Sequence, residues 1–110
     1  MDTKLLKSLE TLIIPTNSLW SIKDISVDSI LCEVNVTMTF TQDYYKVKGK
    51  KQKIYDHRPS RKWRHLDFWQ YKTFIRAEVP RVKTDTGIIS IPVPWAEVNE
   101  RMTELLEKKL

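Results

Sequence analysis

The chain of 110 residues is poor in the residue types that build cross-links, phosphate-binding loops and membrane anchors. Its one cysteine, Cys32, cannot form an internal disulfide, so a reducing cytosol is the expected compartment. Only two glycines are present, Gly49 and Gly87, which excludes a glycine-rich phosphate cradle. No apolar run approaches the roughly 20 residues of a membrane span, and the first residues lack the apolar centre of a signal peptide. The sequence therefore predicts one small cytoplasmic domain, residues 1–110, without a membrane partner.

Catalytic and metal-binding patterns are also scarce. The two histidines, His57 and His65, are separated along the chain, whereas a structural zinc site needs four Cys or His ligands in close pairs. Asp56 and Asp67 each have basic residues nearby, so ion pairing explains them more simply than acid–base catalysis. No Walker, nucleophile-elbow or metalloprotease motif occurs. We expect no enzymatic activity, no cofactor and no metal.

Positive charge is concentrated in one part of the chain. Residues 46–83 hold 13 basic and three acidic side chains, whereas the remainder carries a net charge of −5. A basic segment with interleaved aromatic residues suits a polyanion better than a small-molecule substrate. The alternative is a solvated basic face that only maintains solubility. The predicted DNA contacts are Lys46, Lys48, Lys50, Lys51, Lys53, Arg58, Arg61, Lys62, Arg64, Arg76, Arg81 and Lys83.

The hydrophobic pattern predicts an α+β domain, a mostly antiparallel β-sheet built from about five or six hairpin-connected strands with a helix at each end. Apolar residues at helical spacing indicate an N-terminal helix over residues 1–15, which Pro15 ends, and a C-terminal helix over residues 94–110. Between the helices, residues 17–93 form the β-rich basic core.

Alternation of apolar and polar residues locates the first strands. Residues 19–27 read as a strand with a bulge near Lys23 and Asp24, because the apolar parity changes there. Residues 30–40 read as a long half-buried strand with Cys32 on its apolar face, so we interpret Cys32 as a core residue and not a nucleophile. Residues 44–53 read as a loop or flexible hairpin.

A second hairpin is predicted in the basic segment. Residues 62–68 and 71–79 are its two strands, and Trp69 and Gln70 lie near its turn. The run Asp85-Thr86-Gly87 indicates another turn, followed by a strand over residues 88–93.

Four runs of the sequence resemble, in the same order, the N-terminal region of bacterial insertion-sequence transposases of the ISL-three type. The runs are Tyr55-Asp56-His57-Arg58, Trp63-Arg64-His65-Leu66-Asp67, Pro80-Arg81-Val82 and Pro94-Trp95-Ala96-Glu97. The resemblance covers about residues 45 to 105 and is similar to an ISAon-one-like arrangement, in which this region is a separate short reading frame. It implies a non-catalytic, nucleoid-associated module that grips or recognises transposon-end DNA beside a separately encoded catalytic chain. A homo-oligomer is left open.

In that family the region resembles a zinc ribbon, with one Cys pair before the first run and a Cys/His pair after Pro-Arg-Val. Here residues 45–49 and 84–87 occupy those places and contain no Cys or His. We therefore expect a degenerate, zinc-ribbon-like part whose metal ligands are lost and whose hairpins are held by packing.

The alternative function is a protein-interaction module. In that hypothesis the acidic C-terminal helix, residues 97–110, docks on the separately encoded catalytic chain, and the basic segment only assists.

Overall fold

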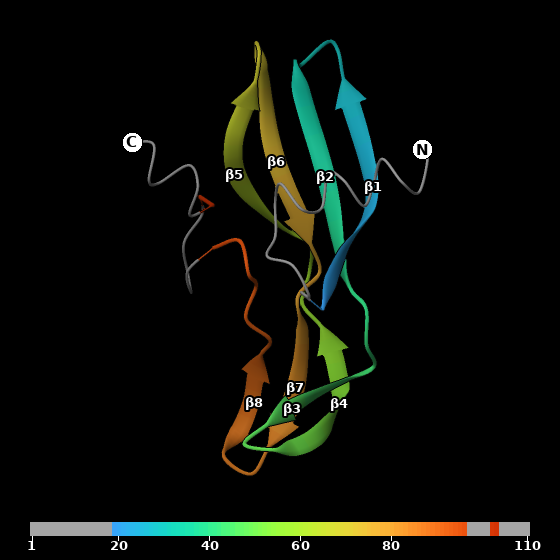
Figure 1. Ribbon diagram of the computed structural model, residues 1–110, viewed down its shortest axis with the longest axis vertical. Helices are drawn as coiled ribbons and strands as arrows, with labels where there is room; N and C mark the ends of the chain where they lie inside the picture. The colour runs from blue at the N-terminus through green and yellow to red at the C-terminus, as the bar shows by residue number, and fades with distance from the viewer. Residues whose placement is uncertain (1–18, 97–101, 104–110) are drawn as a thin grey trace.

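The structure is a computed structural model that describes residues 19–96 and 102–103. The strands are β1 Trp20–Asp28, β2 Glu33–Phe40, β3 Tyr44–Val47, β4 Lys50–His57, β5 Arg61–Phe68, β6 Tyr71–Ala77, β7 Pro80–Thr84 and β8 Gly87–Ser90. They form two four-stranded sheets, which we call the upper sheet, with strand order β1-β2-β6-β5, and the lower sheet, with order β3-β4-β7-β8 (Figure 1). Neighbouring strands are antiparallel except for β2 and β6, which are parallel.

The predicted α+β class is wrong, because residues 19–96 and 102–103 contain strands and turns but no helix. Trp95, where the C-terminal helix was expected to begin, lies in a turn. Further on, Met102 forms a parallel bridge with Arg64, and the Thr103 N–H donates to the Arg64 carbonyl at 2.8 Å. The edge of β5 thus gains a backbone partner that satisfies the Arg64 carbonyl. The helix predicted over residues 1–15 lies outside the described residues.

Alternation correctly located the strands of the upper sheet. The bulge expected near Lys23 is confirmed, since the β1–β2 register shifts between Ile22 and Asp24. The hairpin of β5 and β6 turns at Trp69 and Gln70 as predicted. In β6, Thr73, Ile75 and Ala77 are buried, because every second side chain of a strand points to the same face of the sheet and this face covers the core. The sheets contain more strands than expected, because residues 44–57 form an ordered hairpin and residues 80–84 form β7.

The β1–β2 turn corrects the interpretation of Cys32. The strand predicted from residue 30 begins only at Glu33, and Cys32 lies in the preceding turn with a φ of 53°. The Asp28 carboxylate fixes this turn, because its Oδ1 accepts hydrogen bonds from the N–H groups of Ile30 and Leu31, both at 3.0 Å. Hydrogen bonds between a side chain and the backbone compete with strand pairing. The residues from 30 to 32 therefore form a turn, although Ile30 and Cys32 continue the two-residue spacing of apolar residues in the strand.

Residues 44–53, expected to be a loop or flexible hairpin, form β3, a two-residue turn and the start of β4. Lys48 and Gly49 both have positive φ, 51° and 81°, as a type I′ turn requires. That turn twists in the same sense as its strands, which explains an ordered hairpin in a very basic sequence.

A chain of aromatic rings joins the two sheets through one core. Trp95 makes edge-to-face contacts with Trp20 and Trp63, at centroid distances of 5.0 and 5.3 Å. Trp20 contacts Phe40 at 5.4 Å, and Phe40 contacts Tyr45 of the lower sheet at 6.3 Å. The buried core is contiguous across both sheets and consists of Trp20, Ile22, Val36, Met38, Trp63, Ile75, Ala77, Val79, Val82, Ile91, Trp95 and Ala96.

Candidate nucleic-acid interface

One face of the β3–β4 hairpin gathers lysine and tyrosine side chains. Cross-strand partners in an antiparallel pair point to the same face, and the register pairs Tyr44 with Lys53 and Lys46 with Lys51. Tyr55 continues this face along β4 and is 56% exposed. We call the five residues the lysine face, which consists of Tyr44, Lys46, Lys51, Lys53 and Tyr55.

The cations of the lysine face are available to a ligand. All three lysines are exposed, and no ion pair joins them to an acid within residues 19–96 and 102–103. The Lys51 ammonium lies 4.5 Å from the centroid of the Tyr44 ring, which is the geometry of a cation–π contact. Lys48 and Lys50, at the tip of the same hairpin, are also exposed. All five predicted lysines of residues 46–53 therefore belong to one exposed hairpin.

The arginines of the upper sheet have internal partners instead. Arg64 pairs with Asp67, and its Nη1 also donates to the His65 and Thr73 carbonyls at 3.3 and 3.4 Å. Arg76 Nε donates to Asn35 Oδ1 at 2.6 Å. Both side chains stabilise strand contacts, so their guanidinium groups are less free to fork onto a phosphate or a base edge.

Phe74 lies between two cations on the outward face of the same hairpin. The Lys62 ammonium is 4.4 Å from its ring centroid, and the Arg64 guanidinium carbon is 5.4 Å away. This face is basic, but most of its charge is already engaged by an aromatic ring or an acid.

Arg81 is likewise committed to a partner. Its guanidinium pairs with the Asp56 carboxylate in two-pronged geometry, with Arg81 Nε donating to Asp56 Oδ1 at 2.6 Å. This hydrogen bond lowers the pKa of Asp56 below its usual value and raises the pKa of Arg81. The ion pair expected for Asp56 from the sequence is thus confirmed, and it links β4 to β7.

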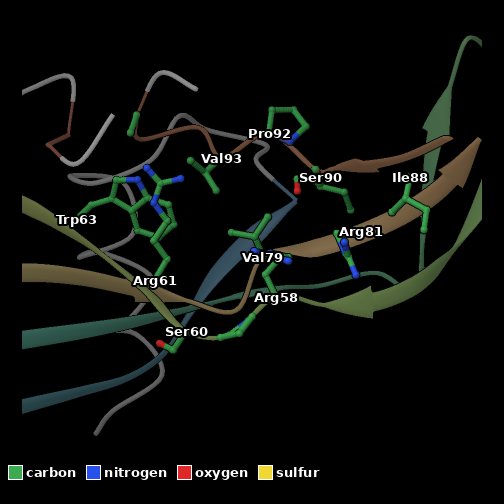
Figure 2. Close-up of a pocket in the computed structure, with 13 residues that line it drawn as sticks. Arg58, Ser60, Arg61, Trp63, Val79, Arg81, Ile88, Ser90, Pro92 and Val93 are labelled. Atoms are coloured by element: carbon green, nitrogen blue, oxygen red, sulfur yellow. The ribbon is translucent and has the colours of Figure 1, made fainter. Parts of the chain in front are cut away.

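A cavity of about 650 Å³ opens where the two sheets meet. Figure 2 shows that Arg58, Arg61 and Arg81 reach its wall, while Trp63 and Val79 provide apolar lining. The Arg61 guanidinium lies 4.9 Å from the Trp63 ring centroid and therefore stacks against the aromatic core. The cavity combines positive charge with an apolar floor, a chemistry that suits an anionic group attached to a planar one.

The expected ligand places at Lys48 and at residues 84–87 fall at the lower end of the lower sheet, where the β3–β4 and β7–β8 turns both lie (Figure 1). Tyr45, near the start of β3, packs instead on Phe40 of the upper sheet. Thr84 Oγ1 donates to the Gly87 carbonyl at 2.8 Å and accepts from the Thr86 N–H at 3.3 Å. The hydroxyl groups thus close the turn among themselves.

Within the described ranges, no three His, Cys, Asp or Glu side chains are grouped so that they could hold a metal ion. Cys32 is in the β1–β2 turn, at the opposite end of the molecule from the lower turns (Figure 1). His65 is buried, and its Nδ1 lies 2.7 Å from Thr103 Oγ1. These residues do not fit the donor set that a structural zinc ion requires. The sequence could not indicate the Thr103 contact, because it joins residues far apart in the chain.

Lys83 lies exposed on β7, away from the cavity wall. The twelve predicted contacts therefore divide into the hairpin lysines, the cavity arginines, the outward face of β5 and β6, and Lys83. Tyr44 and Tyr55 were missed, although tyrosine and lysine follow one another at two-residue spacing on both strands and would have revealed the face.

Part of the chain matches a family model. Residues 49–83, about a third of the chain, match the model of the zinc-finger of transposase IS204/IS1001/IS1096/IS1165. The match supports a relationship to transposases of the ISL3 type. It begins after Lys48 and ends before the β7–β8 turn, so the positions at which zinc ligands were expected lie outside the matched residues. Neither a curated protein nor a solved structure matches the chain. Among the described residues there is also no helix able to cross a membrane.

Proposed function

Starting from the match to a transposase zinc-finger, we propose that this chain is a non-catalytic DNA-binding module that grips the ends of an insertion element. The lysine face carries the proposal, because its lysines have no ion-pair partner among the described residues and lie beside the half-buried Tyr44 and the exposed Tyr55 on an ordered hairpin. Ammonium groups at strand spacing can neutralise phosphates of one DNA backbone, and they release counterions as they do so. The module would act in the cytoplasm, on the nucleoid.

The proposed binding mode grips DNA rather than reading its sequence. Sequence readout in the major groove relies mainly on bidentate arginine or amide contacts to base edges. Arg64, Arg76 and Arg81 are engaged by Asp67, Asn35 and Asp56, whereas lysine acts as a point charge on phosphate. We expect terminal DNA of the element and scrambled DNA of equal length to bind with similar affinity.

The salt dependence of binding tests this proposal. If the five hairpin lysines each neutralise one phosphate, the logarithm of the association constant should fall with log salt at a slope of roughly −4 to −5. Replacing two of them, Lys46→Gln with Lys53→Gln, should reduce the slope by about two units at every DNA sequence.

The matched control replaces Lys23 and Lys62, two exposed lysines outside the hairpin, by glutamine and removes the same net charge. This control should leave the slope near its original value. Equal effects of the two double variants would show that only total charge matters. Absence of binding at low salt would refute the proposed function.

We further propose that the chemistry of transposition belongs to a separate catalytic chain. The match is confined to the zinc-finger part, which supports a module that positions DNA for another polypeptide. Supplying the catalytic chain and an element-end substrate in vitro, with and without this module, should show strand transfer that depends on both. Strand transfer by this chain alone would contradict the proposal.

We also propose that the zinc-finger architecture is maintained here without metal. The aromatic chain from Tyr45 to Trp63 joins the sheets, and hydroxyl hydrogen bonds close the β7–β8 turn. Burial of apolar surface can therefore replace the binding energy of a structural ion.

A further inference from the structure

Four large apolar side chains are exposed at the end of the upper sheet that lies farthest from the lysine face (Figure 1). Ile30 and Leu31, in the β1–β2 turn, are 92% and 64% exposed, and Val27 beside them is 61% exposed. Trp69, in the β5–β6 turn, is 84% exposed. We call these four residues the apolar end. Clustered exposure of this kind on a small protein marks an interaction surface.

The two turns of the apolar end are held side by side. Their strands β2 and β6 are parallel neighbours whose pairing begins with Glu33 and Lys72. The Lys72 N–H also donates to the Cys32 carbonyl at 2.9 Å, which ties the β1–β2 turn to the start of β6. The apolar end is therefore a fixed feature of the sheet and not two independent loops.

Trp69 has a backbone conformation that is unfavourable for a tryptophan. Its φ of 57° lies in the left-handed region, where a two-residue hairpin turn normally has Asn or Gly. Glycine would relieve this strain and remove an exposed indole. The tryptophan therefore does not serve the fold of its own hairpin, which points to a role between molecules.

The charges around the apolar end argue against DNA as its ligand. Asp28 accepts hydrogen bonds from two backbone N–H groups, and Asp67 pairs with Arg64. Glu33 lies opposite Lys72 in the strand register. This end thus offers no excess of free cations to a phosphate backbone, in contrast to the lysine face.

We propose that the apolar end is a dimer interface for a second copy of this chain, related by a two-fold axis normal to the upper sheet. Because the strand order is β1-β2-β6-β5, this axis places each β5–β6 turn against the partner's β1–β2 turn. Trp69 then packs on the partner's Ile30 and the partner's Leu31. Lys72 opposes the partner's Glu33, and each contact occurs twice.

The available area fits such an interface. The four side chains expose on the order of 500 Å² of mostly apolar surface, a large part of the ~800 Å² that each partner contributes to a standard interface. Asp28 and Asp67 lie toward the outer strands, where their existing partners keep them satisfied at the rim. No unpaired charge is buried by this arrangement.

The dimer would place its two β3–β4 hairpins at opposite ends and so present two lysine faces to two DNA segments. This consequence rests on the proposed function, but the interface itself does not. It is therefore tested without DNA.

Sedimentation equilibrium of the purified chain over a series of concentrations is the first test. The unmodified chain should dimerise reversibly, and Trp69→Gly should raise the dimer dissociation constant by at least about tenfold. Glycine suits the φ of this position, so the variant should keep its fold, which circular dichroism and the melting temperature check. A chain that stays monomeric, or a Trp69→Gly variant with unchanged self-association, would overturn the proposal.

Charge exchange tests the two-fold geometry. Lys72→Glu and Glu33→Lys should each weaken self-association, because each places like charges opposite one another across the interface. An equimolar mixture of the two variants should recover dimers, since the mixed pair restores both opposite-charge contacts. If the mixture associates no better than either variant alone, the proposed arrangement is incorrect.

If DNA and not a second copy of the chain binds the apolar end, the same variants should give different results. If the unmodified chain stays monomeric and Trp69→Gly binds DNA more weakly, the apolar end is a DNA contact and the dimer is overturned. If the double variant Lys46→Gln/Lys53→Gln loses DNA binding but keeps its self-association, the result would support separate surfaces for dimerisation and for DNA. Normal DNA binding in that double variant would refute only the lysine face.

Discussion

Trp95 should be the residue whose truncation most weakens the packing of the segment after β8 on the upper sheet. It is 3% exposed and makes edge-to-face contacts with both Trp20 and Trp63. Truncating a buried tryptophan to alanine costs about 3–5 kcal/mol, compared with a total of about 5–15 kcal/mol for a typical domain. At about 4 °C per kcal/mol for a chain of this size, the melting temperature of Trp95→Ala should fall by roughly 12–20 °C.

Urea denaturation followed by circular dichroism measures this loss directly, and two variants separate its causes. The Trp95 N–H has no hydrogen-bond partner among the residues described, so Trp95→Phe should lose less stability than Trp95→Ala. Tyr55→Ala, which truncates an exposed aromatic residue, should change the free energy of unfolding by no more than about 0.5 kcal/mol. If Trp95→Ala stays within about 1 kcal/mol of the unmodified chain, the contacts of Trp95 with Trp20 and Trp63 do not anchor the segment after β8 to the upper sheet.

Three further predictions concern metal, pH and a turn. Excess EDTA should leave the melting temperature unchanged, whereas stoichiometric zinc in elemental analysis and chelator-induced unfolding would contradict a metal-free fold. Burial lowers the pKa of His65 below its ordinary value of 6.5, which favours the neutral ring in the folded state. The unfolded chain therefore binds more protons, so the free energy of unfolding should be highest above about pH 7 and fall toward about pH 5; urea titrations of His65→Gln should show a flatter dependence. At the β3–β4 turn, Gly49→Ala should destabilise the chain by about 1–2 kcal/mol because φ is 81°, whereas Lys48→Gly should be neutral or stabilising; thermal melts with the opposite ranking would exclude a type I′ turn.

The sequence alone determined those features that depend on local periodicity and local turn chemistry. The change of apolar parity placed the bulge between Ile22 and Asp24, and strict alternation located the hairpin of β5 and β6 with its turn at Trp69 and Gln70. Both follow from the two-residue period of a strand, which needs no knowledge of its partner. The sequence also showed the clustering of positive charge in residues 46–83. It likewise showed the resemblance to ISL3-type transposases, which the family match over residues 49–83 supports.

The tertiary structure decided what depends on partners far apart in the chain. The bridge between Arg64 and Met102 replaces part of a predicted helix, because the open edge of β5 offers backbone groups that a helical pattern cannot reveal. The Asp28 side chain converts the residues before Glu33 into a turn, which removes Cys32 from the predicted strand. Local propensity gives way wherever such long-range pairing or side chain–backbone bonding is stronger.

Tertiary structure also decided which cations are free. In the sequence, Lys46, Lys53, Arg76 and Arg81 all appear as equivalent members of one basic segment. In the fold, the two arginines are held by Asn35 and Asp56, whereas cross-strand register brings the two lysines onto one exposed face. Net charge is a property of composition, but the availability of a charge depends on its neighbours in space, and those neighbours are fixed by strand pairing between residues that are distant in the sequence.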